Sequence, residues 1–160
     1  MRERTYAMLK PDGVKMGLFP EVVERFKNVG LEITHTKEMV LNEEILKEHY
    51  AHVANKPFFP ELEKYMLSGP VIAMIVEGED AVNRVRELMG PTNCKEALPG
   101  TIRGDYGSKD DETCRTYNVI HGSDSLENAE IEVNRFFPEL KKNKTLKKAI
   151  YFLFLCLKYS

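Results

Sequence analysis

The segment NVIHGSDS, residues 118–125, places a histidine where an apolar run gives way to glycine and small polar residues. A neutral imidazole is a nucleophile near pH 7 without a separate base, because the ordinary pKa of histidine is about 6.5. Gly122 leaves room beside His121 for an approaching group, and Ser123 can donate a hydrogen bond. Glu132, on the following helix, could orient one ring nitrogen. A lone histidine at a strand end is more often structural, and these neighbours favour a nucleophile.

A phosphate site in this chain would have to use side chains, because neither GxxxxGK[ST] nor GxGxxG occurs in the sequence. Lys10 ends an apolar run directly before a proline, and Arg103 lies in the stretch PGTIRGD. The guanidinium group suits bidentate contacts with phosphate. Each such residue taken singly is most often a solvated surface group. The candidate phosphate ligands are Lys10, Arg86, Thr92 and Arg103.

Two further features concern how a nucleotide could be held. Phe58, in the stretch PFF, could offer an aromatic face to a base, and a pair of core aromatic residues is the alternative. Asn118 and His121 have opposite parity along an ideal strand, so a common site needs a bend, which Gly122 could help to provide. The remaining histidines have no metal-like companions and are expected to be structural or exposed: His35, His49 and His52.

Apolar periodicity predicts the elements that must position these residues. The predicted strands cover residues 5–10, 31–39, 71–76 and 117–120. The predicted helices cover residues 19–29, a segment capped by Asn42, and residues 57–67, 81–89 and 125–137. Asp124 and Glu127 resemble a capping box for the last helix. The loop of about 25 residues before Asn118 is unusually long, which indicates a functional role.

This order of elements predicts the fold class. Without the helical hairpin between the second and third strands, the chain reads βαββαβ, the order of ferredoxin-like α+β folds. We therefore expect a four-stranded antiparallel sheet with helices on one face. Such a fold names no function by itself.

Composition narrows the classes of function. The chain has 160 residues, 42% of them hydrophobic and 30% charged, and a net charge of −2. These values predict a single globular domain and argue against a dominant nucleic-acid surface. Three cysteines at wide spacing form neither a zinc pattern nor a disulfide framework, and the N-terminus has no long apolar segment. A reducing, cytoplasmic location is the expectation.

Five stretches resemble nucleoside diphosphate kinases in the order of that family: YAMLKPDGVKMGL, LKEHY, KPFFPELEKYMLSGPVIAMIVEG, LPGTIRGD and NVIHGSDSLENAE. They cover roughly residues 5–138 and imply a kinase domain over residues 1–138. The resemblance implies ping-pong transfer of a γ-phosphate from a nucleoside triphosphate to a nucleoside diphosphate through phosphohistidine. It implies Mg²⁺ carried by the nucleotide, with no metal ligand from the protein, and a homo-hexamer, with a tetramer as the alternative.

The same resemblance implies roles for individual residues. His121 is the implied nucleophile, and Glu132, Ser123 and Tyr50 are the residues packed around it. The implied nucleotide-binding residues are Lys10, Phe58, Arg86, Thr92, Arg103 and Asn118. A non-catalytic nucleotide-binding or RNA-binding module, or a regulatory scaffold, is the alternative function. An RNA-recognition fold would show aromatic residues on its inner strands, and VIAMIVEG has none.

Two segments depart from the family pattern. The loop over residues 107–117 is a few residues longer than usual and is expected to form a polar lip beside the nucleotide. The tail, residues 139–160, has a lysine-rich part followed by an apolar run over residues 149–157. That run is too short for a membrane span of about 20 residues. We expect it to pack on the domain or a neighbouring subunit, with docking on an anionic membrane as the second choice.

Overall fold

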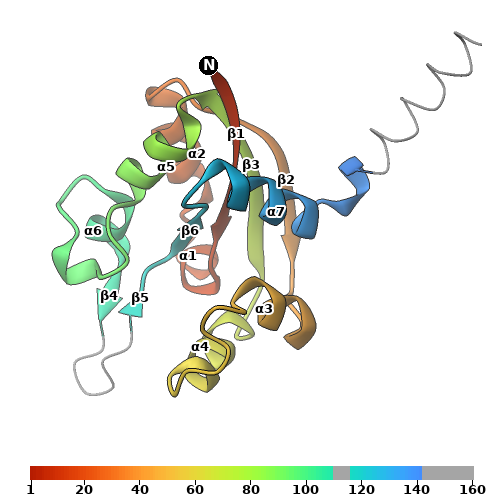
Figure 1. Cartoon of the computed structure of the whole chain (residues 1–160). Helices are drawn as coiled ribbons and strands as arrows, with labels where there is room; N and C mark the ends of the chain where they lie inside the picture. Colours follow the sequence, from red (N-terminus) through yellow and green to blue (C-terminus); the bar gives the residue numbers. More distant parts are fainter. Residues whose placement is uncertain (110–115, 142–160) are drawn as a thin grey trace, which may run out of the picture.

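A computed structural model gives the structure of residues 1–109 and 116–141. Its main sheet is antiparallel and has the strand order β2-β3-β1-β6 (Figure 1). The strands are β1 (Arg2–Leu9), β2 (Glu32–Met39), β3 (Val71–Glu79) and β6 (Ile120–Gly122). Because β1 lies between β3 and β6, the end of the first strand and His121 meet at one place in the sheet. The ferredoxin-like fold class predicted from the order of elements is confirmed.

The helices follow the predicted order, with additions around the site. They are α1 (Pro11–Lys15), α2 (Phe19–Asn28), α3 (Glu43–His49), α4 (Phe59–Met66), α5 (Ala81–Met89), α6 (Ile102–Tyr106) and α7 (Leu126–Phe136). The long loop before Asn118 contains a 3₁₀ helix (Cys94–Glu96), α6 and a small sheet of β4 (Ser108–Lys109) and β5 (Thr116–Tyr117). It is therefore not structureless, and residues 110–115 at its tip lie outside the described residues.

Side-chain caps begin two of the helices that surround the site. Asn42 caps α3 as predicted, since its Oδ1 accepts a hydrogen bond from the Ile45 amide at 2.9 Å. The capping box predicted for Asp124 and Glu127 is wrong. Ser125 caps α7 by accepting from the Asn128 amide at 3.1 Å, whereas Asp124 accepts from the Asn128 side chain. Ser125 takes this role because it is the last residue with extended backbone before the helix.

Helices cover both faces of the sheet, and the expectation of one covered face is wrong. One apolar cluster contains Leu9, Phe26 and Val85, from β1, α2 and α5. The other contains Tyr6 and Phe136, together with residues of α3 and α4. Successive strand residues point to opposite faces, and those in the middle of β1 and β3 are buried on both sides. The hairpin of α3 and α4, with α7, therefore completes a second core layer (Figure 1).

A sharp turn resolves the opposite parity of Asn118 and His121. The predicted strand over residues 117–120 is interrupted at Val119, where φ is +55° and the Ile120 amide donates to the Asn118 carbonyl at 2.6 Å. This is a γ-turn of the strained kind, in a buried β-branched residue. The bend is at Val119 and not at Gly122. Gly122 serves packing instead, because a Cβ there would lie 2.6 Å from the sulfur of Met89.

Main-chain and carboxylate contacts hold this turn. The Lys10 amide donates to the Val119 carbonyl at 2.7 Å, and the Val119 amide donates to Asp12 Oδ2 at 3.2 Å. Asp12 Oδ1 accepts from the Tyr65 hydroxyl at 2.5 Å. Contacts from β1, α1 and α4 thus stabilise a backbone conformation that the turn residue itself disfavours.

No helix among the described residues is long and apolar enough to cross a membrane. The apolar run predicted to pack on the domain, residues 149–157, lies outside the described residues, as does most of the tail.

Candidate active site

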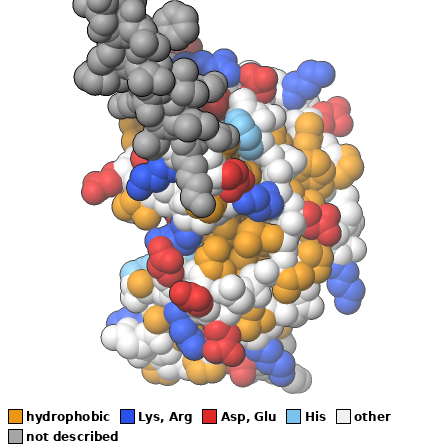
Figure 2. Space-filling model, turned by 90° about the vertical axis from the view of Figure 1, so that its right-hand side faces the viewer, with side chains coloured by type: hydrophobic (Ala, Val, Ile, Leu, Met, Phe, Trp, Pro, Cys, Tyr) orange, Lys and Arg blue, Asp and Glu red, His pale blue; other side chains and the backbone are white. Residues whose placement is uncertain are grey.

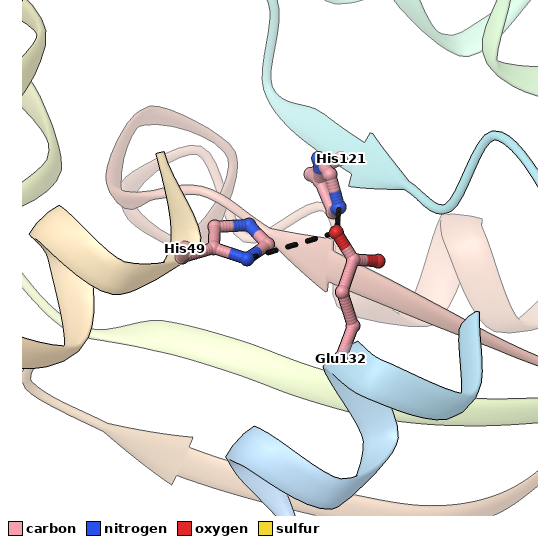
Figure 3. Close-up of side chains that lie close together, drawn as sticks. All are labelled: His49, His121 and Glu132. Atoms are coloured by element: carbon pink, nitrogen blue, oxygen red, sulfur yellow. Dashed lines mark hydrogen bonds and ion pairs between the residues drawn. The ribbon is translucent and has the colours of Figure 1, made fainter. Parts of the chain in front are cut away.

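His121 lies in β6, opposite Met8 of β1, and a carboxylate from α7 contacts its ring (Figure 3). The Nε2 atom of His121 is 3.0 Å from Glu132 Oε1. Ser123 donates a hydrogen bond to the other carboxylate oxygen of Glu132, and both Ser123 and Glu132 are buried. A carboxylate only accepts hydrogen bonds, so in the neutral imidazole Nε2 carries the proton. The lone pair of His121 is therefore on Nδ1.

A buried lysine and an amide form the second part of the site. Lys10 follows β1 directly, and its Nζ donates to Asn118 Oδ1 at 2.6 Å. The side-chain amide of Asn118 donates in turn to the Thr92 carbonyl at 3.2 Å, while the Thr92 side chain is exposed. Burial, followed by the positive charge of Arg103, lowers the pKa of Lys10 to about 8. The γ-turn thus places Asn118 where it holds the lysine.

Arg103, in α6, is fixed by backbone carbonyls. Its guanidinium donates to the Gly90 carbonyl at 3.0 Å and to the Ile120 carbonyl at 2.8 Å. Burial is the main cause that lowers the pKa of Arg103 to about 10, and the charge of Arg86 acts in the same direction. Its Nε is buried without a hydrogen-bond partner in the described part of the chain. Neither Lys10 nor Arg103 forms an ion pair with a carboxylate of residues 1–109 or 116–141, which suits an anionic ligand.

The remaining predicted site residues are Tyr50, Phe58 and Arg86. Tyr50, directly after α3, is buried, and its hydroxyl lacks a partner among the described residues. Phe58, at the start of α4, is 55% exposed, whereas its neighbour Phe59 is buried. Phe58 is therefore not part of a core aromatic pair. Arg86, on α5, is exposed, and its charge acts on Arg103.

His49 was expected to be structural or exposed, with no metal-like companions. It is buried, and the expectation about companions is wrong, because it lies against His121 and Glu132. It is buried at the end of α3, with its ring centroid 4.7 Å from that of His121 at an interplanar angle of 75°. His49 Nδ1 lies 3.6 Å from Glu132 Oε1 (Figure 3). The sequence signal was only its position next to Tyr50, in the stretch LKEHY. Asp12, which holds the γ-turn, was also missed, and its signal was its place after Lys10-Pro11.

Three side chains have the spacing of a metal site: His49, His121 and Glu132. They do not, however, all offer a free lone pair to a metal ion. Each offers one ligand atom, and these atoms all lie within 4.8 Å of one another. However, Arg135 Nη1 is 3.3 Å from His49 Nδ1. Arginine can only donate, so the lone pair that a metal would need already accepts a hydrogen bond. The cluster therefore serves better as a support for His121 than as a cation site.

A partly exposed histidine with a free Nδ1, beside two buried cations on a ferredoxin-like sheet, defines a class of site suited to phosphoryl transfer. The family model of nucleoside diphosphate kinase matches residues 3–142 of this chain. Nucleoside diphosphate kinase of Caldanaerobacter subterraneus is 50% identical over 138 residues, which cover 86% of this chain and 96% of that protein. The enzyme of Thermus thermophilus is 49% identical over 135 residues, covering 84% of this chain and 95% of that one.

Solved structures agree with these relatives. Nucleoside diphosphate kinase of Halobacterium salinarum, a complex with CDP, matches with a TM-score of 0.78 and 46% identity, covering 86% of this chain and 88% of that one. The apo enzyme of Encephalitozoon cuniculi matches with a TM-score of 0.78 and 44% identity, covering 84% and 88%. The chain belongs to the nucleoside diphosphate kinase family and is a phosphotransferase. The alternative of a non-catalytic binding module is not favoured.

Proposed function

We propose that the protein transfers the γ-phosphoryl group of a nucleoside triphosphate to a nucleoside diphosphate in two steps through His121. In the first, the Nδ1 lone pair attacks the γ-phosphorus, the bond to the bridging oxygen breaks, and the diphosphate leaves. In the second, a terminal oxygen of another nucleoside diphosphate attacks the same phosphorus, and the bond to Nδ1 breaks. The observation that carries this proposal is the hydrogen bond from His121 Nε2 to Glu132, which leaves Nδ1 as the nucleophile.

Charge moves into the imidazole ring as Nδ1 bonds to phosphorus. The carboxylate of Glu132 offsets that charge, and Ser123 holds the carboxylate in place. Burial raises the pKa of Tyr50, and the negative charge of the nearby Glu132 raises it further. The Tyr50 hydroxyl, which has no partner in the described part of the chain, is a donor for the transferring group. Glu132, Ser123 and Tyr50 therefore support the nucleophile and do not replace it.

The nucleotide is held mainly by charge. Arg103 and Lys10 contact the phosphates, with Arg86 and Thr92 at the exposed side and Asn118 positioning Lys10. The exposed Phe58 stacks on the base without contacting its edges, which predicts weak base selectivity. Mg²⁺ carried by the nucleotide would neutralise part of the charge of the phosphates. A cationic pocket does not suit a bare metal ion, so the nucleotide brings the Mg²⁺ with it.

Assembly and location complete the proposal. Strand β2 is an edge of the main sheet, and apolar side chains gather between charged ones on that side of the molecule (Figure 2). An edge strand beside apolar surface favours association with a second copy. We propose a cytoplasmic homo-hexamer, with a tetramer as the alternative, built from a kinase domain over residues 1–138 and an atypical tail over residues 139–160. Sedimentation velocity would give its size.

The full chain should be incubated with γ-³²P-ATP and no acceptor. We expect acid-labile label on the wild type and on His52→Ala, which changes an exposed histidine, and release of the label as triphosphate when an unlabelled diphosphate is added. His121→Ala should stay unlabelled and lose turnover by at least about four orders of magnitude, because no covalent route remains. Undiminished label on His121→Ala would refute the proposal.

A further inference from the structure

His49 is buried next to the nucleophile, and the partly buried Arg135 contacts it from the side away from the proposed path of the phosphoryl group. Arg135, on α7, donates from Nη1 to His49 Nδ1, and from Nε to Glu48 Oε1 at 2.9 Å. Glu48 and His49 are neighbours at the end of α3. The contact therefore joins the end of α3 to the helix that carries Glu132.

The geometry determines the tautomer of His49. A guanidinium has five donor hydrogens and no acceptor, so His49 Nδ1 must present its lone pair to Arg135. Burial lowers the pKa of His49 to about 2, and the charges of His121 and Arg135 act in the same direction. The ring is then neutral near pH 7 and carries its one hydrogen on Nε2. That Nε2 is buried without a partner among the described residues, so no contact at Nε2 selects the tautomer.

This tautomer matters because of what His49 Nδ1 faces. It lies 3.6 Å from Glu132 Oε1, the same oxygen that accepts from His121 Nε2 at 3.0 Å. With hydrogen on Nδ1, His49 could move towards that oxygen and become a second donor to it, which would weaken the hydrogen bond from His121. With the lone pair on Nδ1, His49 has nothing to donate there. His121 is then the only histidine that donates to this carboxylate oxygen.

We propose that Arg135 is a positioning residue that locks His49 as the Nε2–H tautomer and so keeps Glu132 Oε1 for His121, a role that rests on the proposed phosphohistidine mechanism. The ring of His49 adds a steric part, since it stands edge-on to His121. Arg135 thus acts on the reaction indirectly, through the side chains of His49 and Glu132, and contacts neither nucleotide nor phosphate.

The wild-type chain, which has four histidines, provides the first test without any nucleotide. In ¹⁵N-labelled protein at pH 7, we expect the His49 ring to show a protonated Nε2 and an unprotonated Nδ1. His49→Gln identifies the signals by their loss. A wild-type His49 with hydrogen on Nδ1, or with both nitrogens protonated, would overturn the lock even in a fully active enzyme.

Variants supply the second test. In Arg135→Leu we expect hydrogen on His49 Nδ1 and an about tenfold slower labelling of His121, the size of one weakened hydrogen bond to a charged group, with the KM for nucleotide unchanged. Arg135→Lys, also only a donor, should restore part of the rate. Arg4→Leu is the matched control, because Arg4 pairs with Glu130 on the same helix and is not among the contacts of His49.

Two outcomes keep this inference separate from the proposed function. If the wild type is labelled on His121 and Arg135→Leu is labelled equally fast, the lock is refuted and the mechanism stands. If the wild type takes no label, the mechanism fails, while the tautomer measurement still decides the state of His49. Should Arg135→Leu fail to fold, Arg135→Lys and the wild-type spectrum decide.

Discussion

The two ends of the site are held in different ways. At the phosphate end, Arg103 is fixed by the carbonyls of Gly90 and Ile120, so the path of the main chain sets its position. At the histidine end, His121 is fixed by the side chain of Glu132, which Ser123 holds in turn. A carbonyl cannot be removed by substitution, whereas a carboxylate can. The phosphate end is therefore robust in geometry, and the histidine end can be altered one group at a time.

The two ends also differ in charge. At the phosphate end two buried cations, Lys10 and Arg103, have no carboxylate partner among the described residues, and burial lowers the pKa of both. At the histidine end Glu132 is buried but accepts hydrogen bonds at both oxygens. A buried charge without a partner destabilises a fold until a ligand binds. A buried charge that has hydrogen-bond partners destabilises it much less. If Lys10 and Arg103 bind the nucleotide as proposed, the phosphate end is less stable without its ligand than the histidine end.

Among residues other than the nucleophile, Arg103→Ala should give the largest effect on activity. The side chain is a preorganised cation for the charge that develops on the transferring phosphoryl group, so kcat/KM should fall about 10²–10³-fold. Circular dichroism should show an intact fold. Arg84→Ala is the control, because Arg84 also donates to a backbone carbonyl, that of Val29 at 2.8 Å, but is not one of the proposed ligands. Wild-type kcat/KM in Arg103→Ala would contradict the role of the phosphate end.

Lys10→Met tests whether the buried charge at the phosphate end destabilises the fold. The pKa of Lys10 is about 8 in the fold against an ordinary 10.5, so between those values the unfolded chain binds more protons and stability rises with pH. Below pH 8 the buried charge costs about 3 kcal/mol. Lys10→Met should therefore unfold at higher urea than the wild type at pH 7, and lose this advantage towards pH 10.5, while nucleotide binding weakens.

Urea unfolding without nucleotide at pH 7, 9 and 10.5 measures this difference. Lys27→Met changes an exposed lysine and should show no such convergence. If Lys10→Met is less stable than the wild type at pH 7, Lys10 stabilises the fold and the contrast between the two ends is wrong.

The sequence could predict the order of elements, because apolar periodicity records which side of each helix or strand is buried. It also indicated His121, Lys10 and Arg103 as candidate site residues, since each stands beside glycine or proline. It could not predict the turn at Val119. A β-branched residue gives no signal for positive φ, and the groups that hold it, Asp12 and the Lys10 amide, are far away in the sequence.

His49 illustrates a second limit. Its burial depends on how the end of α3 packs against β1 and α7, and local periodicity does not contain that arrangement. The same applies to the covering of both sheet faces, which requires the hairpin of α3 and α4 to fold back under the sheet (Figure 1). The residues proposed to carry chemistry were indicated by the sequence, and so were three that position them, Glu132, Ser123 and Asn118. His49 and Asp12, which act through tertiary contacts, were not.

Glu132→Gln should give the smallest of these effects and tests the histidine end. The amide oxygen can still accept from His121 Nε2, and the amide nitrogen can donate to the Ser123 hydroxyl, so the geometry is kept and only the negative charge is lost. A hydrogen bond to a charged group is worth about 1.5–3 kcal/mol, against about 1 for a neutral one. We therefore expect kcat/KM to fall about 10-fold, with KM almost unchanged.

Ser123→Ala, which leaves the carboxylate charged but less firmly held, should lower kcat by less than Glu132→Gln. Stopped-flow measurement of His121 phosphorylation separates this step from nucleotide binding. If Glu132→Gln lost as much activity as Arg103→Ala, the histidine end would depend on charge as strongly as the phosphate end. The proposed difference in charge between the two ends would then be wrong.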